Sequence, residues 1–222
     1  MEGHQTFCGF ELFLAEGFTA APWPVKQIKY YLDTSGYKGN LTQSSIRDVL
    51  GKAWAAWADV IDIQPTPVNS SNGAHVVMRF GAIDGPSKVL AWSHLSDGTL
   101  SQKQQLYDAG EAWETQISLL AVGCHELGHV LGLDHDSANS KALMKPTYDP
   151  GIKYPQGRDV NRMLALGYQP APIVPPTPPS APTGKPVVIT IHGATKVDID
   201  PGDLPVSPLT AGEQAALVSI GE

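Results

Sequence analysis

The segment "CHELGHVLGLDH", residues 124–135, constrains this chain more than any other, because it places three of the seven histidines within eleven positions. His125 and His129 are four residues apart, a spacing that stacks two side chains on one face of an α-helix. Their imidazoles can therefore converge on one ion. Glu126 points about 100° around such a helix from His125, and from there it can reach a water bound to that ion.

The third histidine requires a turn in the chain. A continuing helix would carry His135 about 9 Å beyond His129 along the axis. Gly132 lies between them, and glycine commonly ends helices through a left-handed conformation. Three protein nitrogens leave the fourth position of a tetrahedral zinc ion open for water, which is typical of a catalytic site. Two histidines beside a glutamate can also arise on any solvated helix, but the full H-E-x-x-H-x-x-G-x-x-H string is far more specific.

Composition narrows the classes of partner. The 222 residues suffice for one domain plus an appendage, and the net charge of −7 argues against nucleic acid or an anionic membrane as the main partner. No apolar run approaches the length of a membrane span. Residues 1–17 lack the basic and apolar regions of a signal peptide. The two cysteines, Cys8 and Cys124, do not form a disulfide framework.

Proline marks a domain boundary at residues 169–186, which we interpret as an extended, semi-rigid linker. Residues 1–168 would then form the main domain, with 1–21 as an N-terminal extension. The 187–222 tail is too short to bury a convincing core alone. Whether it is disordered, docks on the main domain or binds an unknown partner stays open.

The main domain has a mixed α+β pattern. Alternating or β-branched runs predict strands at 25–33, 61–64, 74–80, 89–95 and 104–108. Helical spacing of apolar residues predicts helices at 41–60, 115–132 and 157–168. The first of these helices has two candidate N-caps, Thr42 and Ser44.

Over roughly residues 22–168 the chain resembles the metzincin zinc proteases, and among them the matrixins, the family of the matrix metalloproteinases. Besides the zinc string, "ALMKPTY" (142–148) is similar to the family's Met-turn, which places a methionine, here Met144, beneath the zinc. Pro146 and Tyr148 match residues that wall the pocket for the substrate side chain after the cut. The resemblance implies a zincin/metzincin-like fold, with a twisted mixed sheet of about five strands and three helices.

The resemblance also implies a function. We expect a secreted or extracellular zinc endopeptidase, monomeric, that cleaves extended protein or peptide segments with Glu126 as the general base. Substrate would lie along the strand that contains Leu90 and Ala91 and add to the sheet as an extra strand. No nucleic acid and no transmembrane segment is expected.

Two further stretches, "DGPSKVLAWS" (84–93) and "YDAGEAW" (107–113), resemble the family's second metal region. The resemblance implies a calcium ion bound by Asp84, Asp108 and Glu111, with carbonyl oxygens from Gly85, Ser87 and Val89. The alternative is that the three carboxylates are simply solvated. The strand positions where the family binds a structural zinc hold Trp92 and Leu106, so no structural zinc is expected.

Some features depart from the family pattern. Asp136 follows the third histidine, and an aspartate there is typical of the adamalysin branch. Cys8 lies upstream of the first strand, where a matrixin pro-peptide carries an inhibitory cysteine, but its flanking residues differ from that motif. Whether Cys8 acts as such a switch stays open. Cys124 is more simply a small buried residue on the zinc helix.

Two other functions compete with the protease. One is a binding module that holds a protein or polysaccharide without cutting it, and the other is a different zinc hydrolase such as an amidase. The first lacks positive support, because all four catalytic residues are present. The second does not explain the Met-turn.

Overall fold

A computed structural model of the chain describes residues 6–8, 20–139 and 141–172. The tail predicted at 187–222 and most of the linker predicted at 169–186 lie outside these residues. The description that follows concerns the unit Met1–Pro175, the first of two into which the chain divides.

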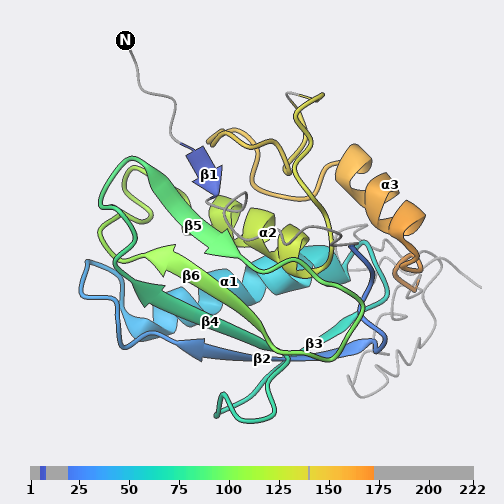
Figure 1. Ribbon diagram of the computed structural model, residues 1–222. Coiled ribbons are helices and arrows are strands. Elements are labelled where there is room, and N and C mark those ends of the chain that lie inside the picture. Colours follow the sequence, from blue (N-terminus) through green and yellow to red (C-terminus); the bar gives the residue numbers. More distant parts are fainter. Residues whose placement is uncertain (1–5, 9–19, 140, 173–222) are drawn as a thin grey trace, which may run out of the picture. The chain divides into compact units, whose positions relative to one another are not determined.

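The centre of the fold is one six-stranded sheet in the order β1-β5-β6-β4-β2-β3 (Figure 1). All neighbouring strands run parallel except β5 and β6, which are antiparallel. The strands are β1 (Thr6–Cys8), β2 (Gln27–Asp33), β3 (Gln64–Pro67), β4 (Val76–Gly81), β5 (Val89–Ser93) and β6 (Lys103–Asp108). The mixed sheet and the α+β class agree with the prediction.

Three helices accompany the sheet: α1 (Gln43–Ala58), α2 (Leu119–Val130) and α3 (Gly157–Leu166). Thr42 is the N-cap of α1, and its hydroxyl accepts a hydrogen bond from the Ser45 amide at 3.1 Å. Helix α2 begins four residues later than predicted. The amides of residues 115–117 donate to the Ala112 carbonyl in a turn, and Ser118 then caps the helix.

Two strands differ from the sequence prediction. The strand expected at 61–64 begins only at Gln64 and continues through Pro65 and Pro67. Proline lacks an amide hydrogen and is tolerated at a sheet edge, and β3 is one of the two edge strands. Strand β1 was not predicted, because three residues are too few for an alternating pattern to be recognised.

Helices α1 and α2 pack together against one face of the sheet, as Figure 1 shows. The Trp57 indole nitrogen donates to the Cys124 carbonyl at 2.8 Å, and both residues are fully buried. Burial raises the pKa of the Cys124 thiol to about 12, so it remains protonated. Among the described residues, no helix has the length and apolarity needed to cross a membrane.

Alanine substitutions at two glycines test how tightly these helices pack. A Cβ at Gly123 of α2 would lie 2.8 Å from Leu50 Cδ2 and 3.4 Å from Ala53 Cβ, whereas a Cβ at Gly51 of α1 would meet nothing within 4 Å. Both substitutions gain helix propensity, worth up to about 1 kcal/mol. We expect Gly123→Ala to lower the free energy of unfolding by about 1–2 kcal/mol, since overpacking exceeds that gain.

Gly51→Ala is the matched control and should raise the free energy of unfolding by about 0.5–1 kcal/mol. Urea denaturation at equal zinc concentration measures both. Equal effects of the two substitutions would contradict the tight contact between α1 and α2.

Candidate metal centre

The structure brings His125, His129 and His135 together. Their ligand nitrogens all lie within 4.8 Å of one another. The ring centroids of His125 and His129 are 4.8 Å apart, and His135 lies 5.3 Å and 4.8 Å from them. Within the described ranges, these histidines are the one group of three or more such donors close enough to hold a metal ion.

Hydrogen bonds to carbonyl oxygens determine the tautomer of two of these rings. His125 Nδ1 lies 2.8 Å from the Leu143 carbonyl, and His129 Nδ1 lies 2.7 Å from the Leu133 carbonyl. A carbonyl oxygen only accepts, so each Nδ1 carries the proton and each Nε2 presents a lone pair. The two Nε2 atoms are 3.1 Å apart. Two facing lone pairs at this distance repel unless a cation lies near both.

The protonation state also suits metal binding. Burial, followed by repulsion from His135, lowers the pKa of His125 to about 3. Burial and the other two histidines also lower the pKa of His129 well below its usual value. Both rings are therefore neutral at physiological pH, which is the form that binds a metal. The donor set fits zinc, which prefers imidazole nitrogens in a tetrahedral arrangement.

The turn that returns His135 depends on Gly132, as the sequence predicted. Gly132 has φ +108°, and its amide donates to the His129 carbonyl at 2.8 Å. A Cβ at this position would lie 2.7 Å from Leu166 Cδ2 and 3.2 Å from the Ala21 carbonyl oxygen. Both the conformation and the lack of space require glycine.

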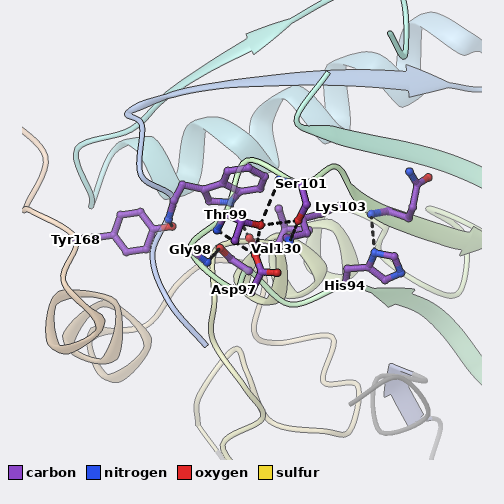
Figure 2. Close-up of polar contacts among 11 residues, drawn as sticks. His94, Asp97, Gly98, Thr99, Ser101, Lys103, Val130 and Tyr168 are labelled. Carbon is purple, nitrogen blue, oxygen red and sulfur yellow. Dashed lines mark hydrogen bonds and ion pairs between the residues drawn. The ribbon is translucent and has the colours of Figure 1, made fainter. Parts of the chain in front are cut away.

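The C-terminal end of α2 is held by side chains from distant parts of the chain. Trp23 donates its indole hydrogen to the Val130 carbonyl at 2.8 Å, and Tyr168 donates its hydroxyl to the Leu131 carbonyl at 2.9 Å. The Trp23 amide in turn donates to the Tyr168 oxygen at 3.1 Å. Figure 2 shows Tyr168 and Val130 in this arrangement. These bonds satisfy carbonyls that a helix end leaves without partners.

A partly buried ion pair lies at the loop between β5 and β6. Lys103 is 4% exposed, and its ammonium lies 2.7 Å from Asp97 Oδ1 and 2.6 Å from the Ser101 hydroxyl (Figure 2). Burial opposes ionisation of Asp97, but hydrogen bonds from Lys103 and Thr99 outweigh it and lower the pKa of Asp97 to about 2. The ion pair between Lys103 and Asp97 therefore persists at neutral pH.

The residues that flank His135 are held from two sides. The Asp136 amide donates to the Met144 carbonyl at 2.7 Å, and the Asp136 carboxylate pairs with Arg158 of α3. The hydrogen bond from Arg158 lowers the pKa of Asp136. Arg162 donates to the Asp134 carbonyl at 2.9 Å. The aspartate that departs from the family pattern thus links the third histidine to α3.

Met144, the methionine of the predicted Met-turn, is fully buried and lies close to Gly128 of α2. A Cβ at Gly128 would lie 2.3 Å from the Met144 sulfur, so glycine is needed for this contact. Sequence reasoning missed Asp159 of α3, a fully buried residue whose carboxylate accepts from the amides of Leu143 at 2.9 Å and Met144 at 3.2 Å. The sequence predicts only a helix at 157–168 here, and an aspartate within it carries no signal of a contact with the segment that contains Met144.

Glu126 is fully buried beside the histidines. Its Oε2 accepts a hydrogen bond from the Ser93 hydroxyl of β5 at 2.6 Å. Sequence reasoning did not identify Ser93, because a single serine in an apolar strand carries no signal of its own.

The acidic residues predicted to bind calcium lie around one loop, but they do not form a cluster of metal-ligand size among the described residues. Asp108 Oδ2 accepts from the amides of Asp84 at 3.2 Å and Gly85 at 3.0 Å, and Glu111 Oε1 accepts from the Ser87 amide at 2.7 Å. Burial, together with repulsion from Asp108 and Asp84, raises the pKa of Glu111. Trp92 and Leu106 occupy the positions at which no structural zinc is expected. They align with each other in the neighbouring strands β5 and β6.

The predicted substrate-binding residues are distributed over two regions. Leu90 and Ala91 are fully buried in β5, and the outer edge of that strand pairs with β1, where Cys8 aligns with Ala91. Tyr148 accepts a hydrogen bond from the Ser118 amide at 3.0 Å and lines a pocket with residues 114–118. Pro146 does not line this pocket.

Comparison with known proteins identifies the same family that the sequence motifs resemble. The family model described as Matrixin matches residues 22–164. Stromelysin-1 of Rattus norvegicus is 30% identical over 60% of this chain, macrophage metalloelastase of Oryctolagus cuniculus is 30% identical over 65%, and karilysin of Tannerella forsythia is 28% identical over 59%. The matched segments cover 30%, 33% and 30% of these relatives' own lengths.

The family match spans well over half of the 222 residues and includes the three histidines, Glu126 and Met144. Together with the geometry of the histidines, it establishes that this chain belongs to the matrixin family.

Proposed function

We propose that this protein is a zinc-dependent endopeptidase that hydrolyses peptide bonds in extended protein segments. The observation that supports it most strongly is the pair of histidines whose protonated Nδ1 atoms face carbonyls while their Nε2 atoms converge. His125, His129 and His135 would hold the zinc ion. Family membership supports the same activity.

Bound zinc supplies a Lewis acid that lowers the pKa of water towards about 7 and polarises the peptide carbonyl. Glu126 then acts as the general base: its carboxylate accepts a proton from the attacking water and returns it to the leaving amine. Glu126, His125 and His129 are buried, and a low-dielectric surrounding strengthens the electrostatic interactions among them.

Substitution of the base separates metal binding from chemistry. We expect Glu126→Ala to retain one zinc per chain and to lose about 10²–10⁴-fold in kcat, because only the proton transfer is removed. His135→Ala should instead lose zinc. Metal analysis and hydrolysis of a peptide library, with and without a chelator, measure both.

A Glu126→Ala variant that retains most of its activity would contradict the assigned base. A wild-type chain that binds zinc and a casein or gelatin substrate without cleaving it would favour the binding-module alternative.

We also propose that the loop at residues 84–89 binds calcium with the carboxylates of Asp84, Asp108 and Glu111. Three carboxylates gather around one sharply folded loop, in which Gly85 and Ser87 have φ of +83° and +68°. Burial, together with repulsion from Asp108 and Asp84, raises the pKa of Glu111, and a divalent cation would relieve the repulsion. Oxygen-rich ligation of this kind suits calcium.

Calcium should therefore stabilise the protein. At a concentration about 100 times its Kd, a ligand adds about 2.7 kcal/mol, which raises Tm by about 5–10 °C for a domain of this size. We expect Asp108→Asn to lose most of this shift and Asp48→Asn, an exposed residue of α1, to retain it. Calorimetry with and without calcium measures the shift, and an equal shift in both variants would refute the site.

For substrate binding, we propose that a peptide pairs with the outer edge of β5 along Val89–Trp92. Strand β1 occupies this edge, with Thr6 aligned to Val89 and Cys8 to Ala91. Because one strand edge pairs with one partner at a time, substrate must displace β1.

A chain that begins at Ala20 tests this competition. We expect its KM for a peptide substrate to fall about 3- to 10-fold, because the fraction of molecules with a free edge rises. Cys8→Ser in the full chain is the control for the cysteine-switch alternative. It leaves KM unchanged if backbone pairing alone inhibits, and it activates the enzyme if the thiol is the inhibitor. An unchanged KM in the shortened chain would contradict the competition.

A further inference from the structure

The face of the sheet beneath Glu126 carries an unusual set of buried polar side chains. Ser93 of β5 aligns with Gln105 of β6, and Ala91 aligns with Tyr107, so all four residues share one face. Ser93 is 0% exposed, Gln105 1% and Tyr107 0%. Apolar side chains would fill such a position without any need for hydrogen-bond partners, because burying a polar group without a partner is unfavourable.

This face packs against α2 at the position of Glu126. A Cβ at Gly123 would lie 4.0 Å from the Tyr107 hydroxyl, so the tyrosine reaches the helix. Burial, followed by the charge of Glu126, raises the pKa of Tyr107, which indicates that the two side chains are close. The Tyr107 hydroxyl donates to Gln105 Oε1 at 3.3 Å. Tyr107 and Gln105 are therefore paired with each other, whereas Ser93 donates a hydrogen bond directly to Glu126.

That hydrogen bond is short and fully desolvated. The Ser93 hydroxyl lies 2.6 Å from Glu126 Oε2, and both residues are 0% exposed. A carboxylate oxygen at this distance accepts a charge-assisted hydrogen bond, which is about twice as strong as a neutral one. It comes from a β-strand of the central sheet, so the donor's position is set by the backbone pairing of β5 with β6.

We propose that Ser93 is a positioning residue for the general base. By holding Oε2, it fixes the rotation of the Glu126 carboxylate and directs Oε1 towards the water that attacks the peptide. The inference rests on the proposed protease activity. A base that must accept a proton within hydrogen-bond distance loses rate when its carboxylate rotates freely, even if substrate and metal still bind.

Two isosteric substitutions test this role. Threonine and valine have almost the same shape, but only threonine retains the hydroxyl. We expect kcat of Ser93→Val to be about 10- to 100-fold below that of Ser93→Thr, with KM changed less than about 3-fold and zinc content equal. Ser93→Ala should show the same loss relative to wild type. The proposal would be overturned if Ser93→Val and Ser93→Thr had equal kcat and Ser93→Ala had the kcat of the wild type.

A control variant separates this role from a general effect of removing a buried hydroxyl. Ser96 is also fully buried, but its hydroxyl accepts a hydrogen bond from the Gly98 amide at 3.4 Å. We expect Ser96→Ala to leave kcat within about 2-fold of wild type, since catalysis requires positioning only at the base. A loss in Ser96→Ala equal to that in Ser93→Ala would overturn the specific role of Ser93.

A stability measurement that does not depend on activity completes the test. We expect Ser93→Ala to lower the urea midpoint in the wild-type background but not in the Glu126→Ala background, because the hydrogen bond is already lost there. Equal shifts in both backgrounds would show that the two side chains are not coupled. A zinc-loaded wild type without activity contradicts the proposed function, whereas an active wild type with unchanged Ser93→Ala kinetics contradicts only the role of Ser93.

Discussion

The metal centre depends on two hydrogen bonds between imidazole rings and backbone carbonyls, from His125 to Leu143 and from His129 to Leu133. They fix the tautomer and the orientation of both rings before any ion arrives. Their acceptors lie in the two segments that follow α2, the turn after Gly132 and the Met-turn. The ligands are therefore positioned by chain that comes after them in the sequence. This explains why the helix, the turn and the Met-turn pack as one unit.

The position of this unit is determined by α3 and by the N-terminal part of the domain. Asp159 holds the amides of the Met-turn, and Arg158 and Arg162 hold the residues beside His135. Trp23 and Tyr168 close the end of α2. Segments at both ends of the domain thus contact the same few residues of the centre.

The sequence alone was sufficient for the parts of the centre whose chemistry depends on local spacing. His125 and His129 are related by one helical turn, and Gly132 is required by a positive φ that only glycine adopts readily. The supporting residues could not be predicted in this way. Ser93 reaches Glu126, and Asp159 reaches Leu143, only because tertiary packing brings distant segments together. The strand predicted at 61–64 likewise ends before the prolines of β3, because a sequence pattern does not reveal which strand lies at the edge.

The direction of β1 has a consequence for how readily it is exchanged. It runs parallel to β5 and contributes three residues, and parallel ladders form slanted hydrogen bonds that are slightly weaker per residue. An incoming chain of opposite polarity would form perpendicular, stronger bonds with the same backbone groups. Because β1 is parallel to β5, an antiparallel peptide would pair with β5 more stably per residue. This difference in stability grows with every additional residue that the peptide pairs.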